Sequence, residues 1–487
     1  IILFGDWLDT MINFIDDILN VFKPCFSRTA AFRWFVVIVT AFLLRSDKLG
    51  VTSVIRDLAL RADTYESLLH FFRASSWSLD SLCRYWMTAV LRFAPLHQEY
   101  NCTILIGDGV KQAKEARFMP GVKKLFQESE NSSKPDFFFG HMFGGLGVLA
   151  GDLSKWFCIP LSIRLHDGLE PLESWLEPSA NTASHVVRMI RDAYDAAKVP
   201  GNSLLLLDRY FLSVPALSEA NHLNQTGQTH LDILTKAKLN CKAYEAAPKK
   251  KPGRGRPPKK GKTVYLKGLF DSCQPLFQES TLVLYGKKEQ VRYYCVNLLW
   301  GQKLYQELRF VLVEYGGTKS ILVSTNLSME PLDMIRLYSY RFRIECTFRE
   351  LKQQTGGFCY HFWSKSMPKL NRCLKKGMAH PLESITQSHA REKIIAAVSA
   401  IECHMMLSVI AMGILQMLSL RYGSLLNVSE FRYMRTPSKK TVSEATMMQY
   451  LRQHIFRFMA ENPHLGITQI ILEKQKRSEI HKDLWIY

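Results

Sequence analysis

Four polar side chains between residues 338 and 352 have the types and the spacing to act on a phosphodiester. The stretch contains neither Pro nor Gly, and a glycine pair follows just beyond it, which is typical of a helix. At roughly 100° per residue, one narrow stripe of that helix would carry Tyr338, Arg341, Glu345 and Lys352. A carboxylate flanked by cationic phosphate-binding groups suits metal-assisted chemistry. A solvated helix face with intrahelical ion pairs is the alternative, because charged helix faces are common.

Two further carboxylates follow strongly apolar, strand-like runs upstream. The run 103–106 leads through Gly107 to Asp108, and the run 203–207 ends on Asp208. In open α/β sheets, ligands bind at the carboxyl edge of the strands. A single Asp after a strand is more often a turn residue or a helix cap. Two such residues, with Glu345 as a third member, reduce the chance of coincidence.

The three carboxylates of Asp108, Asp208 and Glu345 would together be able to hold two divalent cations. Ligand sets made only of oxygen suit Mg²⁺ or Mn²⁺ rather than zinc. Two such ions about 4 Å apart activate a water or a 3′-hydroxyl and stabilise the leaving oxygen of an in-line displacement. Spacing along the chain alone leaves open whether the three carboxylates converge.

Other carboxylates near these elements are expected to be structural. Asp152 and Asp167 lie near predicted strand ends, and Asp167 precedes Gly168 in a turn signal. Glu350 lies about 160° around the predicted helix from Glu345. It is therefore not expected to share the metal site.

Composition divides the chain into five segments that would position these side chains. They are an N-terminal helical DNA-binding domain (1–98), the first part of an α/β catalytic domain (99–238), a basic arm with a β-rich insertion (239–325), the second part of the catalytic domain (326–389) and a C-terminal helical domain (390–487). In the first segment, helices at 52–58 and 65–73 with a turn between them fit either a helix-turn-helix reader of DNA or a plain helical bundle.

The charge balance of the chain favours a polyanionic partner. Its 487 residues carry a formal net charge of +19, for which nucleic acid is the first candidate and a membrane surface or an acidic protein the alternative. The run 248–262 concentrates this charge, and its core around Arg254 and Arg256 resembles an AT-hook that lies in the minor groove. A flexible basic loop that touches only phosphates is the alternative.

Two apolar stretches are predicted to be buried helices rather than membrane spans. Residues 32–44 are short and interrupted by Arg33, and residues 396–420 contain Glu402 and His404. The eleven cysteines form no CxxC pair and are odd in number, which argues against a disulfide framework and indicates a reducing cytoplasm.

The spacing of Tyr338, Arg341, Glu345 and Lys352 resembles the Tyr-Arg-Glu-Lys signature of the cut-and-paste bacterial DDE transposases of the insertion-sequence-four superfamily. The two strand-end aspartates, the β-rich segment before the glutamate and the basic Gly-Arg-Pro segment are also similar to that family. The resemblance covers roughly residues 100–365, and the flanking helical regions match only in general plan.

This resemblance implies an RNase H-like catalytic domain interrupted by a β-rich insertion and flanked by helical domains. It implies that two Mg²⁺ (or Mn²⁺) ions are held by Asp108, Asp208 and Glu345. It further implies that double-stranded DNA is cut at transposon ends, in many members through a hairpin, and that the freed 3′-hydroxyl is joined to target DNA. A homodimer would hold two DNA ends through its C-terminal helices, in the bacterial cytoplasm at the nucleoid and without a membrane.

The resemblance also implies contacts to DNA outside the metal ligands. Tyr338, Arg341 and Lys352 would contact phosphates near the cleaved end. Trp300 would stack on a flipped base, and a tryptophan that packs on a sheet is the alternative. Two other functions stay open: a catalytically inactive DNA-binding protein derived from a transposase, and an RNase H-like nuclease without strand transfer. The complete carboxylate set speaks against the first.

Overall fold

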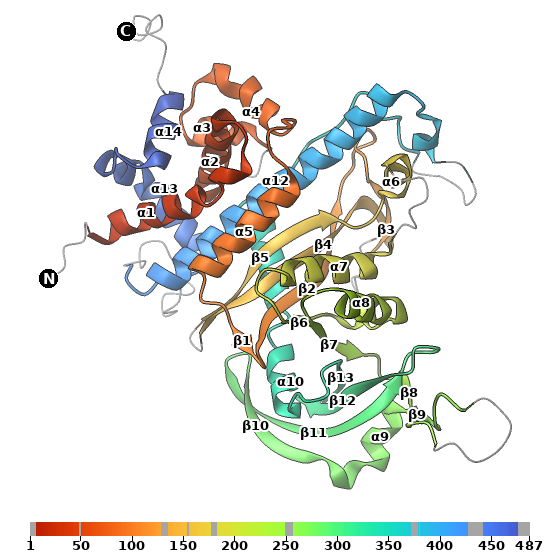
Figure 1. Cartoon of the computed structure of the whole chain (residues 1–487). Helices are drawn as coiled ribbons and strands as arrows, with labels where there is room; N and C mark the ends of the chain where they lie inside the picture. Colours follow the sequence, from red (N-terminus) through yellow and green to blue (C-terminus); the bar gives the residue numbers. More distant parts are fainter. Residues whose placement is uncertain are drawn as a thin grey trace, which may run out of the picture.

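Figure 1 shows a large twisted sheet with a body of helices packed at one end. The computed structural model describes residues 6–47, 50–127, 135–152, 155–176, 183–248, 257–371, 378, 380–426 and 442–475. Arg254 and Arg256 of the basic arm lie outside these described residues.

Five strands form the half of the sheet that carries the two aspartates. They are β2 (Cys102–Ala113), β4 (Phe137–Asp152), β5 (Lys155–Leu165), β6 (Ser203–Leu206) and β7 (Leu231–Ala237). Their order is β5-β4-β2-β6-β7, with β2, β6 and β7 parallel and β4 and β5 antiparallel to their neighbours. The apolar runs at 103–106 and 203–207 are therefore strands, as predicted, and they are continuous because helices cover both faces of the sheet.

The β-rich segment continues this sheet. β13 (Thr318–Ser324) pairs antiparallel with β7, and β12 (Gln306–Tyr315), β11 (Lys287–Trp300) and β10 (Gln278–Leu284) follow outward. The short strands of the sheet are β1 (Gln98–Glu99), β3 (Lys123–Phe126), β8 (Lys242–Tyr244) and β9 (Thr263–Tyr265). The chain is thus a mixed α/β protein with a thirteen-stranded sheet among its described residues. Because β13 pairs directly with β7, the β-rich segment is joined through backbone hydrogen bonds to the half of the sheet that carries the two aspartates.

Helices cover both faces of the half of the sheet that carries the two aspartates. On one face lie α7 (His185–Ala197) and α8 (Val214–Thr226), and on the other lies α11 (Arg343–Gln353), which packs against β5 and β2. The smaller helices are α6 (Glu170–Leu176), α9 (Leu266–Ser272) and α10 (Pro331–Tyr338).

The helices at the two ends of the chain pack together at one side of the sheet (Figure 1). The N-terminal ones are α1 (Asp6–Asn20), α2 (Thr29–Leu44), α3 (Thr52–Asp57), α4 (Tyr65–Phe71) and α5 (Leu79–Phe93), and the C-terminal ones are α12 (Ser388–Tyr422), α13 (Glu444–Glu461) and α14 (Gly466–Gln475). α12 contacts α2, α5 and α13 and also runs along β5. This long helix therefore joins the helical body to the sheet through β5.

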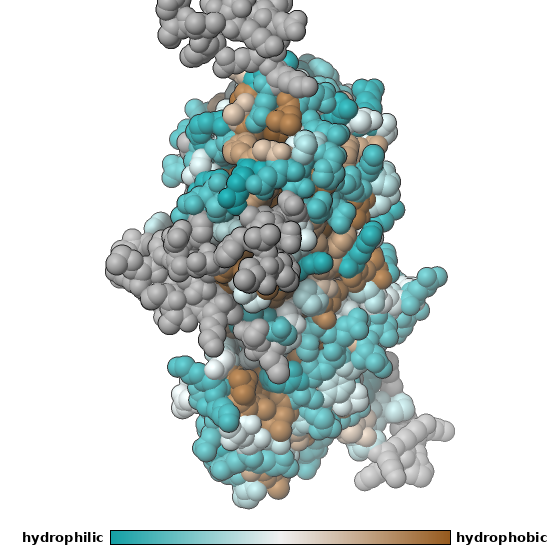
Figure 2. All heavy atoms as spheres, turned by 90° about the vertical axis from the view of Figure 1, so that its left-hand side faces the viewer, coloured by the Kyte–Doolittle hydropathy of each residue, from teal (hydrophilic) through white to brown (hydrophobic). Residues whose placement is uncertain are grey.

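The two apolar stretches are buried helices. α12 is the one helix among the described residues with the length and composition to cross a membrane, but 72% of its most apolar window is buried within the chain. α2 is likewise buried along most of its length. On the face of the molecule seen in Figure 2, hydrophilic side chains predominate and the hydrophobic ones form small separate patches. The apolar side chains of both helices therefore pack mainly against other parts of the protein.

The prediction of one continuous helix over residues 338–352 is wrong, because the structure has two helices with a break between them. α10 ends at Tyr338 and α11 begins at Arg343. Between them the hydroxyl of Ser339 donates to the carbonyl of Arg336 at 2.6 Å, and the Tyr340 N–H turns to the carbonyl three residues back. A serine hydroxyl that takes a helix carbonyl favours a tighter turn over a regular α-helix. Tyr338 therefore lies on a separate helix from Glu345.

Three buried histidines should make the fold acid-sensitive. Burial lowers the pKa of His141 and of His185 to about 4 and that of His404 to about 3. In the unfolded chain each of these histidines takes up a proton below pH about 6.5. In the folded chain the same histidines stay neutral until the pH falls to their lowered pKa values. The contribution of these histidines to stability should therefore fall as the pH drops from about 6.5 to about 4, by on the order of 1 kcal/mol per pH unit for each histidine. The raised pKa of Asp108 opposes this loss in part.

Urea unfolding at pH values between 7 and 4 measures this loss. His404→Phe should flatten the pH dependence, because it removes one of these buried histidines. His389→Phe is the control, since His389 is 77% exposed, and it should leave the slope unchanged. Equal slopes in wild type and His404→Phe would contradict the prediction.

Candidate active site

Asp108 projects from β2 toward α11. It pairs across the strands with Gly145 of β4, so both lie on the face that α11 covers. One carboxylate oxygen accepts from the Gly109 N–H at 2.8 Å, and the other accepts from Arg341 Nη1 at 2.9 Å. Burial raises the pKa of Asp108 to about 6, while Arg341 acts to lower it. The carboxylate is thus held at both oxygens and partly removed from water.

Asp208 follows the neighbouring parallel strand, β6. Its carbonyl accepts from the Thr235 hydroxyl at 2.9 Å and from the Phe211 N–H at 3.0 Å, which fixes the turn after the strand. The negative charges of Asp208 and Glu345 both act to raise the pKa of Asp108. Asp208 and Glu345 therefore both lie within electrostatic reach of Asp108.

Glu345 stands in the first turn of α11, and its side chain is 54% exposed. Arg341 connects it to the sheet, since Nη2 of the guanidinium contacts Glu345 Oε1 while Nη1 binds Asp108. Burial alone would lower the pKa of Arg341, but the adjacent Asp108 carboxylate raises it above the ordinary value. A single guanidinium thus neutralises two of the candidate metal ligands at once.

The donor set fits a hard divalent cation, although its present arrangement does not enclose one. Carboxylates offer only oxygen, which Mg²⁺ and Mn²⁺ prefer. In the part of the chain that the structure describes, no group of three His, Cys, Asp or Glu side chains stands close enough to hold an ion. Arg341 occupies an oxygen of both Asp108 and Glu345, so a metal would bind these oxygens only after the guanidinium moves.

The other two residues of the predicted signature also lie near the carboxylates or on their helix. Burial raises the pKa of the Tyr338 phenol, and the charges of the two aspartates add to the rise. Lys352 lies on α11 two turns beyond Glu345, with Nζ 5.2 Å from the ring centre of Phe358. Burial lowers the pKa of this ammonium. The break in the helix therefore does not separate Tyr338 from the carboxylates.

Trp300 lies at the end of β11, where its indole N–H donates to Cys241 Sγ at 3.1 Å. It is packed against the hydrophobic core. These contacts favour the alternative of a tryptophan that packs on the sheet, and stacking on a base stays a prediction.

Two of the carboxylates that were expected to be structural form ion pairs. Asp167 binds Lys123, and Glu350, with 12% of its side chain exposed, binds Arg349.

Sequence reasoning missed one aromatic side chain at the site. Tyr285 occupies the tip of the β10–β11 hairpin with a φ of 54°, and its ring centre lies 5.4 Å from that of Phe342. Burial raises the pKa of Tyr285, with Arg341 opposing and Glu345 adding to the rise. A Gly-Lys turn at 286–287 signals the hairpin, but only the fold shows that its tip reaches the carboxylates.

A buried histidine pair lies on the opposite face of β2. His166 Nδ1 is 2.9 Å from His185 Nδ1, and His166 Nε2 is 2.8 Å from the Asp192 carboxylate. A Cβ built on Gly109 would lie 2.9 Å from His185 Nε2. The glycine after Asp108 therefore lets the histidine pair pack directly behind the strand that carries the carboxylate.

Comparison with known protein families matches residues 21–268 to the family described as DDE superfamily endonuclease. This span is half of the 487-residue chain and contains both Asp108 and Asp208. The chain belongs to this family. No curated protein and no solved structure matches it significantly.

Membership of the DDE superfamily endonucleases supports a transposase or nuclease function, and the family generally uses divalent metals and acts on DNA. The mixed α/β architecture is consistent with a DDE nuclease fold. The matched span ends before Glu345, so the family match does not include this residue, and its role as the third carboxylate stays a prediction.

A glycine on β4 determines how closely α11 approaches the sheet. A Cβ built on Gly145 would lie 2.5 Å from the Phe348 ring. Gly145→Val should push α11 outward and displace Glu345. A misplacement of about 1 Å costs on the order of a hundredfold in rate, while overpacking of this kind costs about 1–3 kcal/mol of stability.

Both effects can be tested by measuring the DNA cleavage rate and the thermal unfolding of wild type and Gly145→Val in the same preparations. Gly268→Val is the control, because a Cβ built there meets nothing within 4 Å. A folded Gly145→Val variant that cleaves DNA at the wild-type rate would contradict the positioning role.

Proposed function

We propose that this protein is a DDE transposase that cleaves double-stranded DNA at transposon ends and joins the freed 3′-hydroxyl to target DNA. The observation that carries the proposal is the bridge by Arg341, which draws Glu345 of α11 to Asp108 on the sheet. Asp208 follows the adjacent parallel strand and lies within electrostatic reach of Asp108. This is the edge at which open α/β sheets bind ligands.

Asp108, Asp208 and Glu345 would hold two Mg²⁺ (or Mn²⁺) ions. When bound, such ions activate the attacking oxygen and stabilise the leaving oxygen of an in-line displacement. The task of the chain is to hold the carboxylates ionised and in place. The Gly109 N–H and Arg341 stabilise the charged form of Asp108 against its burial. Arg341 would bind a DNA phosphate when it leaves the carboxylates.

Cationic and phenolic groups around the carboxylates would position the DNA. Tyr338 and Lys352 would contact phosphates near the cleaved end. Lys352 is partly removed from water, which strengthens its attraction for an anion. The basic arm with Arg254 and Arg256 would add contacts to the duplex.

The strand order β5-β4-β2-β6-β7, with three antiparallel strands followed by two parallel ones, supports an RNase H-like catalytic domain. The division into segments 1–98, 99–238, 239–325, 326–389 and 390–487 is part of the same proposal. The hairpin route for second-strand cleavage, the homodimer that pairs two ends and the location in the bacterial cytoplasm follow from the resemblance to the insertion-sequence-four superfamily.

Cleavage and joining can be measured together. The full chain is incubated with labelled duplex that carries the element's own ends and with a target plasmid, in Mg²⁺ or in EDTA. Cut ends and covalently joined products are expected only with Mg²⁺. Cleavage without joining would favour a nuclease without strand transfer. Binding without cleavage in either Mg²⁺ or Mn²⁺ would favour a DNA-binding relic.

A further inference from the structure

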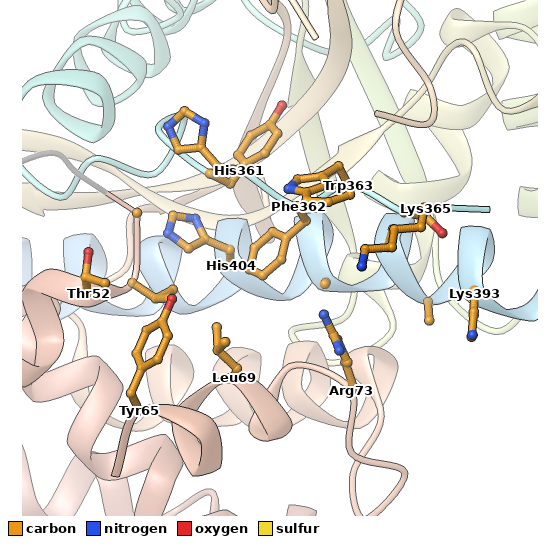
Figure 3. A pocket seen from close by; sticks show the side chains of 17 residues that line it. Thr52, Tyr65, Leu69, Arg73, His361, Phe362, Trp363, Lys365, Lys393 and His404 are labelled. Carbon is orange, nitrogen blue, oxygen red and sulfur yellow. The ribbon is translucent and has the colours of Figure 1, made fainter. Parts of the chain in front are cut away.

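A cleft separate from the carboxylates opens between the N-terminal helices α3 and α4, the strap of residues 360–365 and the long helix α12 (Figure 3). Its volume is about 820 Å³. The residues that line it include Tyr65, Arg73, Trp363, Lys365, Lys393 and His404. The three walls come from regions far apart in the sequence, and the strap continues the chain that leaves α11.

The Arg and Lys side chains among the described residues that line the cleft give it a positive charge. Arg73, Lys365 and Lys393 are exposed at its wall, and none of the described residues that line it is Asp or Glu. In Figure 3, Arg73 rises from just beyond α4 toward Lys365, and Lys393 stands on α12 beside them. None of the three forms an ion pair with another residue in the described part of the chain. Unpaired cations gathered around a cleft are suited to the phosphates of a nucleic acid.

An aromatic surface stands beside these cations. Trp363 is 56% exposed, which is unusual for so large an apolar side chain. The strap that carries it is fixed to the catalytic half, because Lys114 Nζ donates to the carbonyls of Phe358 and Tyr360 at 2.8 and 3.0 Å. A rigid, exposed indole next to cations is the combination with which proteins bind unpaired bases.

The buried side of the cleft carries a polar atom without a partner. His404 is fully buried, its Nδ1 lies 3.2 Å from the Gly357 carbonyl, and its Nε2 has no hydrogen-bond partner among the described residues. Burial lowers its pKa, so the ring is neutral and donates from Nδ1. Nε2 is then an acceptor. A nucleobase offers N–H donors to such an atom, whereas a phosphate offers none.

We propose that this cleft holds an unpaired nucleotide of a DNA strand, with its base on Trp363 and toward His404 and its flanking phosphates on Arg73, Lys365 and Lys393. This inference deepens the proposed function, since it names a second contact with the same DNA substrate. The strap from α11 to the cleft places this contact on the chain that immediately follows the carboxylate helix. A free nucleotide shares the same chemistry, and the experiment separates the two.

Fluorescence anisotropy measures binding of a labelled single strand of about ten nucleotides, a length typical of one binding cleft, and of a blunt duplex of the same sequence. Trp363→Ala should weaken single-strand binding about tenfold and leave its salt dependence unchanged, because stacking releases no ions. Arg73→Ala with Lys365→Ala should reduce the slope of log affinity against log salt by about 0.7 per lost phosphate contact. Duplex binding should change little in either variant.

Control variants remove cationic and aromatic side chains elsewhere on the surface. Lys23→Ala with Lys303→Ala deletes two exposed cations outside the cleft, and Phe126→Ala deletes an aromatic that is 53% exposed. Both should bind single strands as wild type does. Equal binding by the cleft variants and these controls would overturn the proposal, provided that thermal unfolding shows all of them folded. Displacement of the strand by an equal concentration of thymidine monophosphate would assign the cleft to free nucleotides and would also overturn it.

These outcomes are independent of cleavage. If the cleft variants bind like wild type while the full chain still cuts and joins DNA, the cleft proposal fails and the transposase proposal stands. If single-strand binding depends on the cleft but no cleavage occurs, the transposase proposal fails and the cleft proposal stands.

Discussion

Glu345→Gln should reduce DNA cleavage about a thousandfold, because a metal-binding carboxylate supplies several kcal/mol of transition-state stabilisation. The substitution keeps the shape of the side chain and removes only its charge. Glu345 is 54% exposed, and its contact with Arg341 is a partly solvated ion pair, so the fold should lose little stability. The variant is therefore expected to be folded, to bind DNA and to leave it uncut.

Glu350→Gln is the matched control, since it makes the same change less than two turns along the same helix. Glu350 pairs with Arg349, and its side chain is 12% exposed. Its cleavage rate should stay within a few-fold of the wild-type rate. The measurement is the rate at which wild type and each variant cleave duplex DNA that carries the transposon ends, in Mg²⁺. Thermal unfolding of each preparation shows whether the variant is folded. The assignment of Glu345 would be wrong if its variant retained more than a tenth of the activity or if the Glu350 variant lost as much.

The two aspartates could be predicted from the sequence because their strands are buried on both faces. Such strands appear as unbroken apolar runs, and the polar residue that ends each run marks the edge of the sheet. Asp208 follows its strand as this rule predicts. For Asp108 the rule is wrong in part, because β2 continues to Ala113, and Asp108 instead lies just beyond the residues of β2 that pair with β6. The β-rich segment before Glu345 was also predictable from its alternating pattern and turns, although its direct pairing with β7 was not.

The helix that carries Glu345 could be predicted only in part. Periodicity treats residues 338–352 as one helix, but it does not register that the Ser339 hydroxyl competes for a backbone carbonyl. Tyr285 was missed for a different reason. Its position depends on how far a hairpin reaches, which is set by the length and twist of strands that pair over a long distance. Neither the packing of the two chain ends against each other nor the cleft between them leaves a local sequence signal.

Removal of the Arg341 side chain should have opposite effects on metal binding and on catalysis. Arg341→Met keeps an unbranched side chain but deletes the charge that now occupies Asp108 and Glu345. Divalent metal should bind more tightly, since no guanidinium competes for those oxygens. Cleavage should nevertheless fall about a hundredfold, because the variant loses a group that would bind the phosphate in the transition state.

The same variant should depend on metal for its stability. Asp108 and Arg341 are 19% and 15% exposed, so removal of the arginine leaves a largely buried carboxylate without its partner. Breaking a pair of this kind costs about 3 kcal/mol, and the burial that raises the pKa of Asp108 is then opposed mainly by the Gly109 N–H. A bound divalent ion would replace the lost positive charge. Mn²⁺ should therefore raise the unfolding temperature of Arg341→Met more than that of wild type.

Arg343→Met provides the control for this experiment, because it removes the same charge from the start of the same helix. Arg343 forms no ion pair among the described residues and instead lies over the Phe342 ring, 4.9 Å from its centre. Its response to Mn²⁺ should match that of wild type. If Mn²⁺ stabilised all three proteins equally, Arg341 would not compete with metal. The carboxylates would then hold their ions without displacing the guanidinium, and the bridge would be a permanent part of the site.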